Sequence, residues 1–268
     1  MTHILLAGCG KMGTAMLTGW LNNLNDDITF SVVDPAIDAT HPLAGRPNVT
    51  FAKSADADLP SPDMVVLAVK PQMMAEALPP LVKVSRKDTV WLSIAAGISV
   101  KWLQDAIAEN APIIRTMPNT PAAIGRGVTA MFTGEGVPGE MSDMAKSLLA
   151  VTGQVVILDD EKDMDAVTAV SGSGPAYVFY LKEALEGAAI NAGLKPELAA
   201  ILAEQTIIGA AALMDESNES ASQLRVNVTS PGGTTQAALD VLMAEDGLLR
   251  LMKKTVLAAR ERSRELGN

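Results

Sequence analysis

The chain has 268 residues, 48% hydrophobic and 19% charged, which suffices for one large globular domain or two ordinary ones. Its net charge of −10 argues against a nucleic-acid partner, because phosphate binding needs clustered positive charge, and against an anionic membrane surface. A single cysteine excludes an internal disulfide, and no basic region precedes the first apolar run as in a signal peptide, so we expect a cytoplasmic protein.

In the first half of the chain, short runs rich in Val, Ile and Leu alternate with helical patterns. Near-continuous apolar runs between helices are typical of strands buried on both faces, hence of a mostly parallel sheet. Strands are expected at residues 3–8, 29–34, 63–69, 89–97, 113–118, 127–132 and 154–158, with helices at 14–24, after Lys70-Pro71, at 100–109 and at 143–151.

After Leu158 the pattern becomes helical. Helices are expected at Ala176–Ala192, Pro196–Met214, Thr234–Met243 and Asp246–Leu266. We therefore predict two domains: an α/β domain over residues 1–160 and an all-α domain over residues 161–268. The stretches ALEGAAINAG and ELAAILAEQTIIGAAALM are apolar round most of their circumference, so they need cover on nearly every side. A second copy of the chain provides that cover most simply, which predicts a homodimer or a larger assembly.

The opening stretch LLAGCGKMGTAML follows a strand and precedes a helix. Its Gly8, Gly10 and Gly13 have the GxGxxG spacing of Rossmann-type dinucleotide-binding domains. In that motif the first glycine permits a tight turn, the second lets a pyrophosphate approach the backbone, and the third lets the helix pack on the sheet. The alternative is an ordinary strand-to-helix turn.

Asp34 ends the second strand, about twenty residues after the glycine loop. A carboxylate there accepts hydrogen bonds from a ribose diol and repels a 2′-phosphate, which favours NADH over NADPH. Asp34 could instead only begin an Asp-Pro turn.

Three further motifs end predicted strands: AVKPQ at 68–72, SIAAG at 93–97 and MPNTP at 117–121. The carboxyl ends of strands line the ligand crevice of an open α/β sheet, although each motif alone could be a plain turn. In VTSPGGTT, Gly232, Gly233 and Thr234 could offer backbone N–H groups to an anion at a helix N-terminus, with Ser230 adding a hydroxyl. A capped helix after a tight turn would also explain that composition.

Together with VSGSGPAYVFYL at 170–181, these motifs make the chain closely resemble pyrroline-5-carboxylate reductases, the last enzymes of proline biosynthesis. GCGKMG, AVKPQ, SIAAG, MPNTP, SGSGPAY and SPGGTT occur in the family's order along essentially the whole chain. The resemblance implies a Rossmann-type N-terminal domain and a helical C-terminal domain that intertwines with its partner in a homodimer or in a larger ring such as a decamer. It also implies hydride transfer from NADPH or NADH to L-1-pyrroline-5-carboxylate, giving L-proline.

The resemblance assigns roles to individual residues. Thr235 would contact the imine nitrogen, and Glu161 and Asn227 match positions near the substrate. The expected substrate site therefore comprises Glu161, Asn227, Ser230, Gly232, Gly233 and Thr234 beside Thr235. The expected cofactor site comprises Gly8, Gly10, Lys11, Met12, Gly13, Asp34, Ala68, Val69, Lys70, Pro71, Ala95 and Asn119. Of these, Lys70, Pro71, Ala95 and Asn119 would line the nicotinamide side.

One segment departs from the family. A Glu-x-His-Pro-like sequence usually precedes the SPGG loop, whereas this chain has SNESASQLRVN, without the histidine and proline. The acidic family position cannot be placed among Glu216, Asn218 and Glu219. Where the family often has an aspartate two places before Asn227, this chain has Arg225.

Other candidates have plainer explanations. The acidic run DDEKDMD could bind a cation, but acids at a helix start are the simpler interpretation. His3 and His41 belong to no motif, and Cys9 serves as a small filler in the glycine loop. A related hydroxy-acid dehydrogenase would need Lys182 as its acid/base, and a redox-sensing binding protein would lack turnover.

Overall fold

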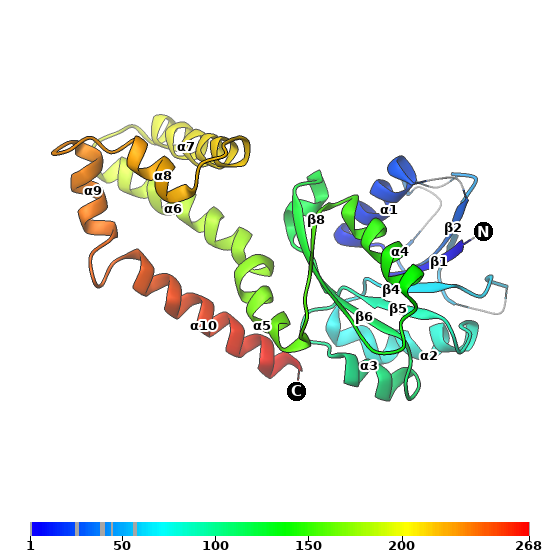
Figure 1. Ribbon diagram of the computed structural model, residues 1–268. Coiled ribbons are helices and arrows are strands. Elements are labelled where there is room, and N and C mark those ends of the chain that lie inside the picture. Colours follow the sequence, from blue (N-terminus) through cyan, green and yellow to red (C-terminus); the bar gives the residue numbers. More distant parts are fainter. Residues whose placement is uncertain (1, 25–26, 38–40, 44, 56–57, 268) are drawn as a thin grey trace. The chain divides into compact units, whose positions relative to one another are not determined.

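The computed structural model describes residues 2–24, 27–37, 41–43, 45–55 and 58–267 (Figure 1). The chain forms two compact units, Met1–Ser173 with Ala259–Asn268, and Gly174–Ala258. We call them the N-terminal unit and the helical unit. The units divide at residues 173 and 258, whereas the sequence pattern changes near residue 160.

The N-terminal unit contains an eight-stranded sheet in the order β3-β2-β1-β4-β5-β6-β7-β8. All neighbouring strands are parallel except β6 and β7. The expected α/β, Rossmann-like fold is confirmed. The strands are β1 (Thr2–Ala7), β2 (Ile28–Val33), β3 (Val49–Ala52), β4 (Met64–Leu67), β5 (Val90–Ser93), β6 (Ile113–Met117), β7 (Gly127–Thr133) and β8 (Gly153–Ile157).

One strand of the sheet was not predicted, and one pair of neighbours is antiparallel within the mostly parallel sheet that was expected. The strand β3 was not predicted, because its four residues lie between turn-forming stretches and carry a polar Thr50. The strand β7 runs antiparallel to β6, because the nine residues that join them leave no room for the crossover that a parallel pair requires.

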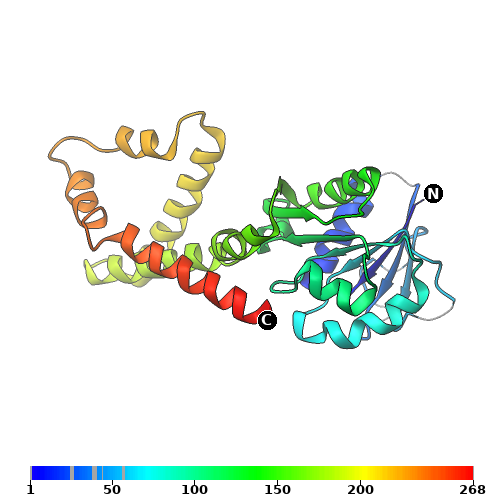
Figure 2. The same cartoon turned by 60° about the horizontal axis from the view of Figure 1, so that its bottom comes forward.

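Helices cover both faces of the sheet, as Figures 1 and 2 show. One core joins Ile4, Leu6 and Val66 to α1 (Lys11–Asn23) and α4 (Gly139–Ala150). The other joins their strand neighbours, Leu5 and Val65 among them, to α2 (Met74–Val84) and α3 (Val100–Ile107). Alternate residues of each strand thus point to opposite helical layers, which explains the continuous apolar runs.

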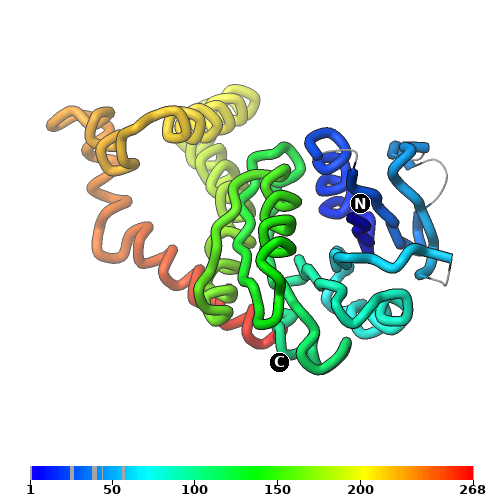
Figure 3. The backbone as a smooth tube through the Cα atoms, turned by 45° about the vertical axis from the view of Figure 1, so that its right-hand side comes forward, coloured from blue at the N-terminus to red at the C-terminus, as the bar shows by residue number. Residues whose placement is uncertain are grey.

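In the helical unit, α6 (Gly174–Asn191) and α7 (Pro196–Glu216) pack on each other near the turn that joins them (Figure 3). Gly193, at φ +101°, ends the first helix, and Pro196 begins the second. The small side chains of Ala199 and Ala203 are buried. The remaining helices are α5 (Met164–Val167) in the N-terminal unit, α8 (Ala221–Asn227), α9 (Thr234–Leu242) and α10 (Leu248–Gly267), which belongs to both units.

The long helices of the helical unit expose many apolar side chains, including Phe179, Tyr180, Ile201 and Ile208. Among the described residues, α7 is the one helix long and apolar enough to cross a membrane, and only 11% of its apolar stretch is buried. Glu204 lies in the middle of that helix. Cover by another copy of the chain would bury these side chains without placing a carboxylate in a bilayer.

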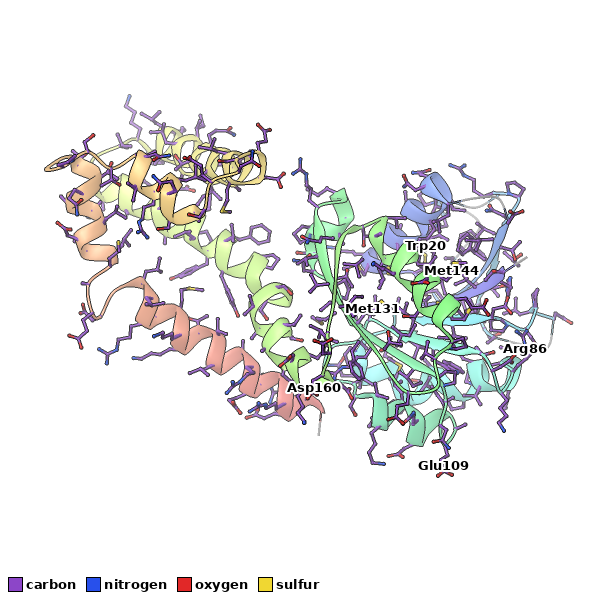
Figure 4. All side chains as sticks on the ribbon, in the orientation of Figure 1. Trp20, Arg86, Glu109, Met131, Met144 and Asp160 are labelled. Carbon is purple, nitrogen blue, oxygen red and sulfur yellow. The ribbon has the colours of Figure 1, made fainter. Side chains whose placement is uncertain are left out.

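Trp20 is the largest anchor of the α1 layer. Its ring is fully buried and stacks on Phe30 with centroids 5.4 Å apart, and its Nε1 donates a hydrogen bond to the carbonyl oxygen of Leu148 at 2.8 Å. Trp20 belongs to the same apolar core as Met131, against which Met144 packs; Figure 4 labels the three residues. This one side chain therefore ties α1 to both β2 and α4.

We predict that Trp20→Ala lowers the free energy of unfolding by about 3–5 kcal/mol, because it leaves a large cavity and an unpaired buried carbonyl. Urea unfolding measures the change. Trp102→Ala, at a half-buried position on α3, is the control and should cost clearly less. Equal losses in the two variants would contradict this role for Trp20.

Candidate functional site: the carboxyl edge of the sheet and the α8–α9 loop

The glycine loop lies where the strand order reverses, between β1 and β4. Gly8 has φ +94°, and a Cβ there would lie 2.7 Å from the carbonyl oxygen of Ala68. A Cβ on Gly13 would lie 2.2 Å from the carbonyl oxygen of Gly8. By contrast, a Cβ on Gly10 would meet no described atom within 4 Å. Two glycines thus serve close packing, and the third leaves open space at the N-terminus of α1, where an anion can approach.

Asp34 organises the same loop. One carboxylate oxygen accepts a hydrogen bond from the backbone N–H of Cys9 at 2.7 Å, and the other accepts one from that of Ala36 at 2.8 Å. The second bond forms the Asp-Pro turn that was the plainer interpretation, and the first holds the carboxylate against the glycine loop. Each oxygen keeps accepting capacity for a ribose hydroxyl.

The other expected cofactor residues follow neighbouring strands. Lys11 and Met12 begin α1, Ala68 to Pro71 follow β4, Ala95 follows β5, and Asn119 follows β6. The structure therefore brings the whole expected cofactor set to one edge of the sheet. Ala95 is almost fully buried, and its N–H donates a hydrogen bond to Oγ of Ser93 at 3.3 Å.

Asn119 has both ends of its side-chain amide engaged. Its Nδ2 donates to the carbonyl oxygen of Ser171 at 3.2 Å, and its Oδ1 accepts from the backbone N–H of Val128 at 3.0 Å. Ser171 lies in a π-helical turn at Thr168–Gly172, within the SGSG motif. Asn119 thus links two of the motifs, and such widened turns often occur at functional sites.

Glu161 is likewise committed to protein contacts. Its Oε1 accepts hydrogen bonds from Nη1 of Arg115 at 2.7 Å and from the backbone N–H of Val100, at the start of α3, at 2.9 Å. Arg115 lies on β6 with a side chain only 7% exposed, so its charge depends on this carboxylate. These contacts give Glu161 a structural role, and its expected role near the substrate stays a prediction.

The SPGG loop joins α8 to α9 in the helical unit. Gly232 has φ +69°, a conformation that favours glycine, and Gly233 is the N-cap residue of α9 and provides no side-chain cap. The N–H of Gly233 donates to the carbonyl oxygen of Ser230 at 3.0 Å. It is therefore not available to an anion, contrary to the prediction. The N–H groups of Thr234 and Thr235, in the first turn of α9, have no carbonyl behind them.

The departing segment Ser217–Ser222 joins α7 to α8, a helix that was not predicted, and its last two residues begin that helix. Ser220 caps this helix by accepting from the N–H of Gln223 at 3.2 Å. Glu219 accepts from Nδ2 of Asn227 at 2.8 Å, and Oδ1 of Asn227 accepts from Gln223. Asn227 therefore braces α8 immediately before the SPGG loop.

The two groups of expected residues lie on different units. The cofactor set and Glu161 belong to the N-terminal unit, and Asn227, Ser230, Gly232, Gly233, Thr234 and Thr235 belong to the helical unit. Thr235 is half-buried, and its hydroxyl has no hydrogen-bond partner in the described part of the chain.

The structure gives little support to the other candidate sites, which are Lys182, Cys9 and the acidic run DDEKDMD. Lys182 pairs with Glu186, and this hydrogen bond raises the pKa of the lysine, which makes it a poorer acid/base near neutral pH. Burial raises the pKa of the Cys9 thiol, while its bond to Thr14 acts in the opposite direction. Asp160 caps a short 3₁₀ turn, and no three His, Cys, Asp or Glu side chains among the described residues converge on a metal position.

Sequence reasoning missed three residues near this site. Arg115 carried a usable signal, because a charged side chain within the apolar run IIRTM requires a buried partner. His41 faces Cys9, with Nε2 3.7 Å from the sulfur, and nothing in the sequence indicated that contact. Lys53 directly follows β3, the strand that was not predicted, and Ala52 before it accepts a hydrogen bond from the N–H of Asp34 at 3.1 Å.

Comparisons with known proteins match both the N-terminal sheet region and the C-terminal helical region of the chain. A family model described as pyrroline-5-carboxylate reductase dimerisation matches residues 161–266, so the helical half is a dimerisation domain. A model described as NADP oxidoreductase, coenzyme F420-dependent, matches residues 3–97, which include the glycine loop and Asp34.

Whole-chain relatives extend the match. A solved pyrroline-5-carboxylate reductase from Coxiella burnetii is 33% identical with a TM-score of 0.90, covering 100% of this chain and 99% of that one. The enzyme from Plasmodium falciparum, solved with NADP bound, is 28% identical with a TM-score of 0.82, covering 100% and 98%. The pyrroline-5-carboxylate reductase of Pseudomonas aeruginosa is 35% identical, with 98% of this chain and 96% of that protein covered, and the one from Haemophilus influenzae is 38% identical, covering 99% and 98%. With more than a third of its residues identical to the latter two enzymes along nearly its full length, the chain belongs to the pyrroline-5-carboxylate reductase family.

Proposed function

We propose that this protein reduces L-1-pyrroline-5-carboxylate to L-proline with NADPH or NADH, the final step of proline biosynthesis. The observation that carries the proposal is a pair of helix N-termini suited to anions. One, at α1, follows the glycine loop, and the other, at α9, follows the SPGG loop. A dinucleotide and a small carboxylate substrate would each occupy one of them.

The residues at the sheet edge fit a nicotinamide dinucleotide. The open space at Gly10 would receive the pyrophosphate, and Asp34 would bind the adenosine ribose. The matched NADP oxidoreductase model and the relative solved with NADP bound support this cofactor class. These matches point to NADP, whereas Asp34 favours the free diol of NAD. We therefore propose that the protein uses both NADPH and NADH.

The α9 N-terminus fits the substrate carboxylate. The N–H groups of Thr234 and Thr235 point along the helix axis towards the SPGG loop, and the exposed Ser230 can add a hydroxyl donor. Pro231 restricts the loop, so the donors are held in place before the substrate binds. Fixed backbone donors avoid the entropy cost of ordering a long cationic side chain.

The Thr235 hydroxyl would orient the imine nitrogen and hold or share its proton. The residues at the carboxyl edge of the sheet would hold the reduced nicotinamide cofactor, which would supply the hydride for the imine carbon, while the C=N electron pair would pass to nitrogen beside the Thr235 hydroxyl. The chain's own task is chiefly to hold the two reacting atoms in line, and such positioning can contribute several powers of ten in rate.

The dimerisation domain supports a homo-oligomer, and we propose a homodimer that can assemble further into a ring such as a decamer. The exposed apolar side chains of α6 and α7 would be covered by the partner. On the same reasoning we propose that α7 lies in a protein interface rather than in a membrane. We also propose that the enzyme is cytoplasmic. Its net charge of −10 supports the absence of a nucleic-acid partner.

The glycine loop gives a first test. Gly13→Ala should disturb the loop and lower the free energy of unfolding, because its Cβ would overlap the carbonyl oxygen of Gly8. Gly10→Ala should leave unfolding within about 0.5 kcal/mol of the wild type but weaken NADPH binding at least about tenfold. Urea unfolding and calorimetric titration measure both. A Gly10→Ala protein that binds NADPH normally would show that the pyrophosphate lies elsewhere.

The two roles of Glu161 can be separated. Because Arg115 would keep an uncompensated buried charge, Glu161→Ala should lower the free energy of unfolding by about 3 kcal/mol, and adding Arg115→Met should recover part of it. Glu161→Gln in the Arg115→Met background, which carries no uncompensated buried charge, separates the substrate role: a raised KM for the imine relative to that background, with no further loss of stability, would support direct contact. Unfolding that is unaffected by Glu161→Ala would contradict the structural role.

The function itself is tested by nicotinamide oxidation with purified protein and L-1-pyrroline-5-carboxylate. We expect turnover with both cofactors, and a drop in kcat of about a hundredfold for Thr235→Val, in the range of a lost general acid. Thr255→Val on α10 makes the same hydroxyl-to-methyl exchange and should leave kcat unchanged. Absence of turnover from the folded oligomer would contradict the proposal. Loss on Lys182→Met with Thr235 dispensable would favour a hydroxy-acid dehydrogenase.

A further inference from the structure

A small apolar pocket lies beside Asp34 in the N-terminal unit. It has a volume of about 200 Å³ and sits at the carboxyl ends of β1 to β4. Its lining includes Val33, Pro35, Lys53, Ala55, Val69 and Met73. An apolar slot next to a ribose-binding carboxylate suits the flat face of the adenine ring of a dinucleotide.

A lysine and an aspartate stand next to each other at this pocket. Val33 pairs with Ala52 between β2 and β3, and the N–H of Asp34 donates to the carbonyl oxygen of Ala52 at 3.1 Å. Lys53, the next residue, is therefore the immediate neighbour of Asp34 across the two strands. Its side chain is exposed and forms no salt bridge with any residue that the structure describes.

The other charged groups nearby are engaged or placed differently. Lys11 begins α1, at the pyrophosphate position, and His41 contacts Cys9 and accepts from the N–H of Leu43. Arg46 is exposed but does not line the pocket, and Glu76 adds a negative charge to the pocket wall. Lys53 is thus the cation that both lines the pocket and neighbours the ribose-binding carboxylate.

We propose that Lys53 binds the 2′-phosphate of NADPH and so determines how well this protein accepts NADPH in place of NADH. This inference rests on the proposed use of a nicotinamide cofactor. Asp34, with both oxygens already receiving backbone N–H groups, serves the free diol of NADH. Lys53 offsets the repulsion between Asp34 and a 2′-phosphate. The two residues together account for the acceptance of both cofactors.

Two nucleotide fragments test the assignment without any turnover. The compound 2′,5′-ADP carries the 2′-phosphate, and 5′-AMP lacks it. Calorimetric titration of the full-length protein should show that Lys53→Gln weakens 2′,5′-ADP about tenfold, as expected for a charge-assisted contact, and 5′-AMP less than about twofold. Lys53→Glu should weaken 2′,5′-ADP further. Wild-type affinity for 2′,5′-ADP should also fall more steeply with salt than affinity for 5′-AMP.

The control is Lys87→Gln, which removes the same charge from an exposed position before β5, at the opposite edge of the sheet. It should leave both affinities unchanged. Equal weakening of the two fragments by Lys53→Gln would show that the lysine only supports the pocket, and unchanged binding of 2′,5′-ADP would place the phosphate elsewhere. Either result overturns the inference.

The fragment result is independent of the proposed reaction. Selective loss of 2′,5′-ADP in a protein that does not reduce the imine would uphold Lys53 and contradict the reductase. Turnover with both cofactors, together with unchanged 2′,5′-ADP binding in Lys53→Gln, would uphold the reductase and contradict Lys53.

Discussion

The whole cofactor edge depends on the contact between the loops that follow β1 and β4. Gly8 lies so close to the carbonyl oxygen of Ala68 that no side chain fits between them, and Gly13 lies still closer to the carbonyl oxygen of Gly8. This approach sets the start of α1 against the sheet and leaves Gly10 facing open space. Asp34 then fixes the loop through the N–H of Cys9. A helix N-terminus is thereby presented at the point where the strand order reverses.

The helical unit also presents a helix N-terminus after a glycine-containing loop, at the start of α9. At Gly232 and Gly233 the chain turns into α9 without a side-chain cap, so backbone donors remain for a carboxylate. Ser220, Glu219 and Asn227 brace α8 immediately before that turn. The segment that departs from the pattern expected from the resemblance therefore has its own hydrogen bonds, built from Ser220, Glu219 and Asn227.

Most of the fold could be predicted from the sequence, because buried parallel strands and long helices leave strong apolar patterns. Short elements could not: β3 has only four residues, and α8 depends on the Ser220 cap rather than on apolar periodicity. The site was predicted as a set of motifs, but its pairings were not. The bonds from Glu161 to Arg115 and from Asn119 to Ser171 join residues 46 and 52 positions apart, which no local pattern reveals.

The central claim is that this chain brings a hydride donor and a cyclic imine into line. The most direct measurement uses reduced nicotinamide cofactor carrying deuterium at the transferred position, followed by mass spectrometry and NMR of the product. The account predicts L-proline with one deuterium on Cδ, the ring carbon that is bonded to nitrogen and does not carry the carboxylate. Proline without deuterium, or no proline from protein that binds the cofactor, would contradict it.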